Sequence, residues 1–162
     1  MPKEFNLKKE YEALRKKYKQ LPSFKELDNE FELSMNPLKE IYEVNYPLRW
    51  IRRRMVDKIG WVANFLQNVL APNPAFLVNI QESKFLESER EKIMVLLKDL
   101  MYLARRSMFF DLNLNDKTEA EFIASVHREW HGNKGKIIEL VNKVNKGWKE
   151  ETNEEITGGY IG

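Results

Sequence analysis

The sequence contains no cysteine. This absence excludes disulfide bridges, thiolate metal ligands and cysteine nucleophiles, and it is typical of proteins in a reducing compartment. Glycine and proline are also scarce, with 7 and 6 among 162 residues. The chain has no Gly-rich phosphate loop and no G-x-S-x-G nucleophile turn. These absences favour a non-catalytic protein without a cofactor, although an active site assembled from scattered residues is left open.

The chain also lacks long apolar runs and a large net charge. No apolar run approaches the roughly 20 residues that cross a bilayer, and the residues MPKEFNLKKEYEAL at the start have no apolar signal-peptide centre. We therefore expect a cytoplasmic protein with no membrane segment. Lysine and arginine total 27 against 25 aspartate and glutamate, a net charge of +2. Any surface that attracts nucleic acid must therefore be local.

Signals for helices cover most of the chain. Apolar residues recur at intervals of three and four, Asn6 and Ser23 are typical helix caps, and prolines and glycines mark the stops. The pattern predicts an all-α, single-domain bundle of about six or seven helices. The helical domain is expected to cover 1–152, with a candidate sub-boundary at 71–75 and a flexible tail over 153–162.

The expected helices follow from these signals in chain order. They cover 7–21, 23–31, a segment that opens at residue 36, 48–70, 75–86, 88–110, 117–131 and a last helix after residue 135. Pro47 either starts a new helix or kinks a longer one. Gly132 and Gly135 are expected to end one helix and form a turn before the last.

The segment 88–110 is predicted to be the central helix of the bundle. Ser88 opens a capping box. At about 100° per residue, most apolar side chains fill one broad face. Val95, Tyr102 and Phe109 lie near the opposite side. A helix that is apolar nearly all round is expected to be buried on several sides.

The segment from Leu48 to Trp61 carries the most informative surface pattern. Between Arg49 and Lys58 it has five basic residues and one acidic residue. On a helix, Trp50 and Arg54 are placed to stack, and Arg53 is placed to pair with Asp57. The candidate contact residues are Arg49, Trp50, Arg53, Arg54, Lys58 and Trp61.

Three interpretations of this segment are open. Tryptophan and arginine dominate the energetics of protein interfaces, which favours an unknown protein partner or a homo-oligomer. Guanidinium groups beside aromatic faces also bind RNA or DNA, which is the alternative function. In the third interpretation another helix covers the face and both tryptophans belong to the core. The leading hypothesis is a non-catalytic binding or scaffolding protein.

Arg52 projects near the apolar stripe of the same helix. A cation at such a position has two explanations. It lies at a frayed helix start, or it is partly buried and paired with an acidic residue.

His127 and His131 form the remaining candidate for chemistry. Residues four apart share one helix face, so both imidazoles can reach one metal ion. Glu129 lies about 200° round the helix from His127, so it cannot serve as the general base of an H-E-x-x-H site. Structural histidines are the favoured interpretation, and a metal-dependent enzyme is kept as a third alternative.

The segment DLNLND, residues 111–116, resembles a calcium loop only in part. Asp111, Asn113 and Asn115 match the first three ligand positions, but Asp116 stands where such a loop needs glycine. The segment is therefore predicted to be a capped turn between helices. Glu119 is expected to cap the following helix and to lie on its solvated face.

Overall fold

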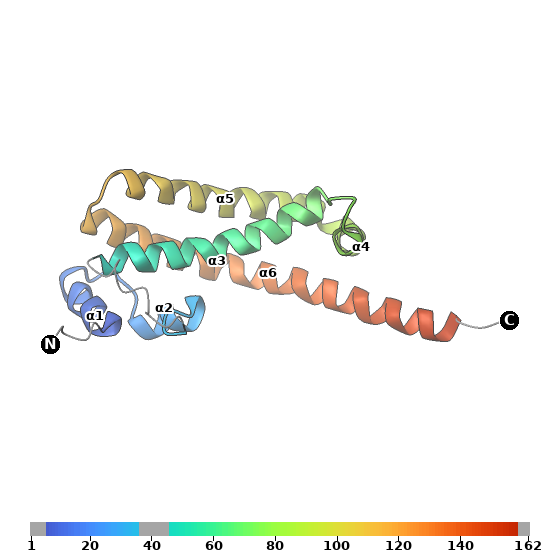
Figure 1. Cartoon of the computed structure of the whole chain (residues 1–162), viewed down its shortest axis with the longest axis horizontal. Helices are drawn as coiled ribbons and strands as arrows, with labels where there is room; N and C mark the ends of the chain where they lie inside the picture. The colour runs from blue at the N-terminus through green and yellow to red at the C-terminus, as the bar shows by residue number, and fades with distance from the viewer. Residues whose placement is uncertain (1–5, 36–45, 159–162) are drawn as a thin grey trace. The chain divides into compact units, whose positions relative to one another are not determined.

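The chain is all-α, as predicted. The computed structural model describes residues 6–35 and 46–158, with side chains to 152. Within these ranges it shows six α-helices and one short 3-10 helix, η2 (Figure 1). Their bounds are α1 Leu7–Lys17, α2 Phe24–Phe31, α3 Pro47–Leu70, α4 Leu77–Phe85, η2 Glu87–Glu89, α5 Arg90–Leu112 and α6 Asp116–Gly158. The helical segment predicted to open at residue 36 lies largely outside the described residues.

Contacts within the chain divide these helices into two compact units. Among the described residues, unit 1 takes those of Met1–Trp61 and Leu100–Trp130, and unit 2 takes those of Val62–Asp99 and His131–Gly162. The divisions fall inside α3, α5 and α6, whereas the prolines of the candidate boundary at 71–75 belong to unit 2. None of the described helices is long and apolar enough to cross a bilayer.

The local signals at the start of the chain behave as expected. The Asn6 side chain caps α1 by accepting a hydrogen bond from the Lys9 amide at 3.0 Å. Ser23 and Glu26 form the predicted capping box at the start of α2. Pro47 starts α3, which decides between the two alternatives for this proline. The caps fix where the short helices begin, and apolar burial then holds them in place.

Helix α6 corrects the expected break at Gly132 and Gly135. It runs without interruption from Asp116 to Gly158. A glycine inside a helix costs only about 1 kcal/mol relative to alanine. A glycine ends a helix when its backbone adopts the left-handed conformation, which has a positive φ. No described glycine has a positive φ. The helix also continues past residue 152, where the tail was expected to begin, and residues 159–162 lie outside the described residues.

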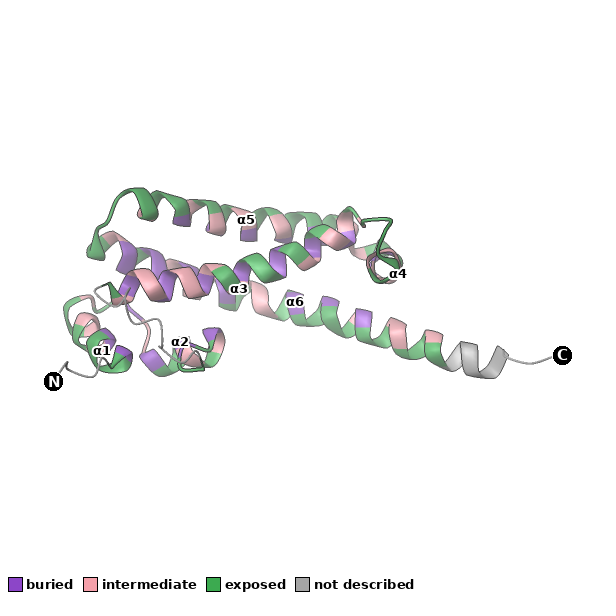
Figure 2. Cartoon of the chain, in the orientation of Figure 1, coloured by how far each residue is buried: buried purple, intermediate pink, exposed green. Residues whose placement is uncertain are grey.

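Helix α5 corrects the expected burial on several sides. Its buried residues lie along one face: Ile93, Leu96, Leu100, Leu103 and Ser107. Figure 2 shows exposed residues along much of the rest of this helix. The exposed large apolar residues are Met94, Val95, Tyr102, Met108, Phe109 and Leu112. The periodicity of the sequence identifies the apolar positions of a helix, but it does not show how many other helices pack against it. Helix α5 also begins two residues after Ser88, which lies inside η2 and does not cap it.

Candidate binding surface on helix α3

The first half of α3 buries one stripe and presents the opposite side. Leu48, Ile51, Met55 and Ile59 are buried in the core. On other positions of the helix, Trp61 is 72% exposed, and Trp50 and Arg54 are half-buried. Neither tryptophan is therefore a fully buried core residue. The Arg54 guanidinium lies 3.7 Å from the carboxylate of Asp57, so this arginine contacts the acidic residue of the segment.

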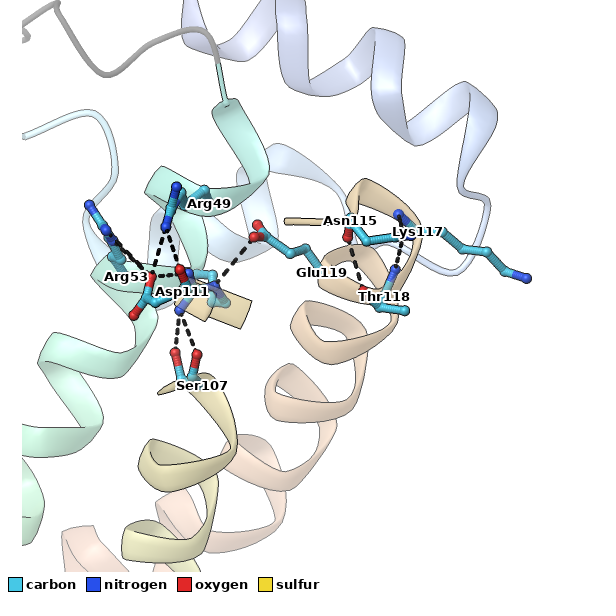
Figure 3. Close-up of polar contacts among 9 residues, drawn as sticks. Arg49, Arg53, Ser107, Asp111, Asn115, Lys117, Thr118 and Glu119 are labelled. Carbon is cyan, nitrogen blue, oxygen red and sulfur yellow. Dashed lines mark hydrogen bonds and ion pairs between the residues drawn. The ribbon is translucent and has the colours of Figure 1, made fainter. Parts of the chain in front are cut away.

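Three arginines of α3 converge on one carboxylate at the end of α5. Figure 3 labels two of them, Arg49 and Arg53, beside Asp111. The Nη2 atom of Arg52 lies 2.6 Å from Oδ1 of Asp111. The Nη2 atoms of Arg49 and Arg53 each lie 3.4 Å from the same oxygen. Arg49 also donates to the Asp111 carbonyl at 3.2 Å. Hydrogen bonding from Arg52 holds the pKa of the Asp111 carboxyl below its ordinary value, with the nearby arginine charges acting in the same direction.

Arg52 is fully buried, at 0% exposure. Its Nη1 atom donates to the Ser107 carbonyl at 3.0 Å and to the Ser107 hydroxyl. Its guanidinium lies 5.8 Å from the centre of the Phe110 ring. The sequence alternative of a buried arginine paired with an acidic residue is therefore confirmed. Arg52 fixes α3 against the last turns of α5 within unit 1.

Glu119 is the site residue that the sequence placed wrongly. It was expected on a solvated face, but it is only 2% exposed, and its Oε1 atom lies 3.8 Å from Nε of Arg52. Asn115, one residue before the predicted cap, instead accepts the amides of Lys117 and Thr118 at 3.0 and 3.2 Å. The capping frame is therefore shifted by one residue, and Glu119 is free to turn inward (Figure 3).

The environment of Glu119 disfavours its charge. Within the described part of the chain, neither of its carboxylate oxygens accepts a hydrogen bond. Burial raises the pKa of this carboxyl, while the charge of Arg52 opposes the shift. Glu119 also lines a pocket of about 320 Å³ beside the start of α6. The other lining residues are Tyr18, Tyr46, Arg49, Leu114, Asn115, Asp116 and Lys117.

Lys58 also binds within unit 1. Its ammonium group donates to the carbonyl of Glu30 at 2.6 Å and lies 3.6 Å from the carboxylate of Glu32. It therefore ties α3 to the last turn of α2 and its C-cap. Of the six predicted contact residues, Arg49, Arg53 and Lys58 contact other helices or caps inside the unit, and Arg54 pairs with Asp57 of its own helix. Trp61 is the most exposed residue of this surface, and Trp50 and Arg54 lie half-buried on the same helix.

The two histidines lie on α6, with His127 half-buried and His131 exposed. Among the residues that the structure describes, no cluster of three or more His, Cys, Asp or Glu side chains is arranged to hold a metal ion. The described fold thus supplies no third protein ligand to this pair. A catalytic zinc site ordinarily has three.

No protein-family model, curated protein or solved structure matches this chain. A functional inference therefore rests on the geometry of helix α3 and of the residues around it.

Proposed function

We propose that the protein is a non-catalytic helical protein that binds another protein through the α3 surface, which we define as Trp50, Arg53, Arg54 and Trp61. The observation that carries this proposal is the exposure of Trp61, at 72%. A tryptophan on a protein surface leaves a large apolar area in water, and tryptophan beside arginine is the typical composition of an interface hot spot.

The fixed surroundings of this surface support the proposal. Arg53 contacts Asp111 from α5, and Lys58 contacts the chain around α2, so α3 is held on two sides within unit 1. A rigid helix presents its side chains at a smaller entropic cost on binding than a loop does. The α3 surface is therefore suited to the recognition of a folded or helical partner.

The ion pairs favour a protein over a nucleic acid. Phosphate binding depends on cations that are free to displace counterions. In this segment Arg49, Arg52 and Arg53 share the Asp111 carboxylate, and Lys58 contacts a carboxylate of its own. The positive charge between Arg49 and Lys58 is thus partly neutralised inside the molecule.

Site-specific photocrosslinking in cells tests the proposal. A benzophenone amino acid at position 61 is expected to give a discrete crosslinked product with one protein, identified by mass spectrometry. The same probe at Lys25, an exposed position on α2 in unit 1, is the control. The product should be lost in an Arg54→Glu variant and retained in a Lys25→Glu variant.

A fluorescence-anisotropy titration with single-stranded RNA and duplex DNA distinguishes nucleic-acid binding, the alternative function, from protein binding. Arg54→Glu is the informative variant, because Arg53→Glu would also disturb the contacts of Asp111. Salt-sensitive binding that Arg54→Glu abolishes would favour nucleic acid instead. Equal crosslinking at positions 61 and 25, or none at position 61, would contradict a protein interface on α3. Sedimentation velocity shows whether the partner is a second copy of the chain.

A further inference from the structure

Within unit 1, α5 presents a second apolar surface that the proposed function does not use. Its exposed residues include Tyr102, Met108, Phe109 and Leu112, and Leu112 is 89% exposed. We call these four residues together with Arg105 the α5 surface. Tyr102, Arg105, Phe109 and Leu112 follow one another at intervals of three, four and three. This spacing places them on one side of the helix, in the pattern of a helix that packs against another helix.

Neighbouring side chains of α5 hold the two aromatic rings of the α5 surface in place. The guanidinium of Arg106 lies 5.5 Å from the centre of the Tyr102 ring, and it also pairs with the Glu129 carboxylate at 3.4 Å. The Phe109 ring makes an edge contact with Phe110, with centroids 5.6 Å apart. Since side chains that are already ordered lose little entropy on binding, such rings are suitable anchors for a partner.

Phe110 links the exposed Phe109 ring to the core of unit 1. Its ring packs on the buried Phe122, with centroids 4.9 Å apart. Phe122 also receives the Arg106 guanidinium at 5.4 Å from its ring centre. The exposed rings of α5 are therefore connected through Phe110 and Arg106 to the core of unit 1.

Arg105 determines which partner chemistry fits. Its side chain is exposed, and its Nη1 atom lies 3.5 Å from the thioether sulfur of Met108. Among the described residues no carboxylate pairs with it. A guanidinium surrounded by apolar side chains is matched by a carboxylate that arrives with the partner.

We propose that the α5 surface binds an amphipathic helix of another protein, with apolar residues on its contact face and an acidic residue opposite Arg105. A second copy of this chain fits less well. A symmetric pairing centred on this surface would bring the two Arg105 guanidinium groups together, and like charges across an interface are repulsive. The proposal adds a surface and a partner class to the function proposed for α3, and it does not depend on that function.

Two synthetic helical peptides with the same leucine face test it, one flanked by glutamate and the other by lysine. Fluorescence anisotropy at low and moderate salt measures their binding to the full chain. We expect the glutamate peptide to bind about tenfold more tightly than the lysine peptide. The Arg105→Glu variant should reverse this order. Replacing both Phe109 and Leu112 by serine should weaken both peptides by about tenfold.

The control variants change matched groups elsewhere in unit 1. Arg128→Glu reverses an exposed charge on α6, and Met35→Ser removes an apolar side chain that is also exposed. Both should leave peptide binding unchanged, and so should Trp61→Ala, which separates this proposal from the α3 surface. Far-UV circular dichroism verifies that each variant is folded.

Several results would overturn the proposal. These are equal affinity for the two peptides, no saturable binding of the glutamate peptide, or an order of affinities that Arg105→Glu does not change. Self-association that the Phe109 and Leu112 double variant abolishes, measured by sedimentation velocity, would assign the surface to a second copy. Flotation with phosphatidylglycerol vesicles, lost in the same variant and without peptide binding, would assign it to a lipid surface.

Discussion

The Nη2 atom of Arg52 lies 2.6 Å from Oδ1 of Asp111, so a fully buried cation meets a carboxylate that is 41% exposed. This contact joins α3 to the end of α5 within unit 1. The exposed side of the carboxylate stays solvated, so this ion pair has a smaller desolvation cost than one in which both ions are buried. Arg49 and Arg53 then share the same oxygen. Much of the basic character of α3 is therefore used to hold the fold.

Removal of Arg52 tests this structural role. Arg52→Ala is expected to destabilise the protein by about 3–5 kcal/mol, because it removes the cation that lies 3.8 Å from the buried Glu119 and opens a gap in the core. Urea unfolding followed by circular dichroism measures the loss. Arg105→Ala, an exposed arginine on α5, is the control and should change stability by less than about 0.5 kcal/mol. A loss for Arg52→Ala as small as that of the control would contradict the structural role.

Asp111→Asn tests the same contact through its pH dependence. The pKa of Asp111 is lowered from its ordinary value of 3.8, so ionised Asp111 stabilises the fold above that value. This stabilisation is lost as the pH falls through the lowered pKa. We therefore expect Asp111→Asn to be less stable than the wild type at pH 7 and to approach it as the pH falls below about 4. Urea unfolding across this range measures the difference, and a constant difference would contradict the expectation.

Glu119→Gln is expected to show the opposite trend. The pKa of Glu119 is raised above its ordinary value of 4.5, so the protonated form is favoured in the folded state. This contribution to stability is complete below pH 4.5 and is lost as the pH rises through the raised pKa. Glutamine keeps the shape without the charge. The variant should therefore gain stability relative to the wild type as the pH rises from 4 to 8, and the opposite slope would show that Arg52 outweighs burial.

The sequence predicted the features that depend on local chemistry. The capping box at Ser23, the cap at Asn6 and the start of α3 at Pro47 each follow from a few neighbouring residues. Buried positions such as Phe122 and Trp130 follow from helical periodicity. The all-α class needed only these two signals, and it was confirmed.

The features that the sequence misplaced depend on distant residues. Whether Glu119 faces water or Arg52 depends on a residue that is 67 positions away. Tyr102 and Phe109 were assigned to a buried helix because an apolar residue looks the same in a core and on a binding surface. The sequence contains one local indication that arginines converge on Asp111, namely the position of Arg52 beside an apolar stripe. That signal indicated a buried pair but not the identity of its acid.

Gly147 gives the last prediction, in unit 2. A Cβ atom built at this position would lie 2.5 Å from Cγ of Phe85, which packs edge-on against Trp148 with centroids 5.4 Å apart. Gly147→Ala should therefore displace Phe85 and with it α4. Overpacking of this kind costs about 1–3 kcal/mol, which exceeds the helix propensity gained from alanine, about 1 kcal/mol. Urea unfolding followed by circular dichroism measures the net loss.

Gly135→Ala is the matched control on the same helix. Nothing lies within 4 Å of a Cβ atom at this position, so the substitution should stabilise the protein by up to about 1 kcal/mol through helix propensity alone. It also tests the continuity of α6, because replacing a glycine in a left-handed turn by alanine would destabilise the protein. Opposite signs for the two glycines are therefore expected. Destabilisation at Gly135 would restore the helix break that the sequence suggested.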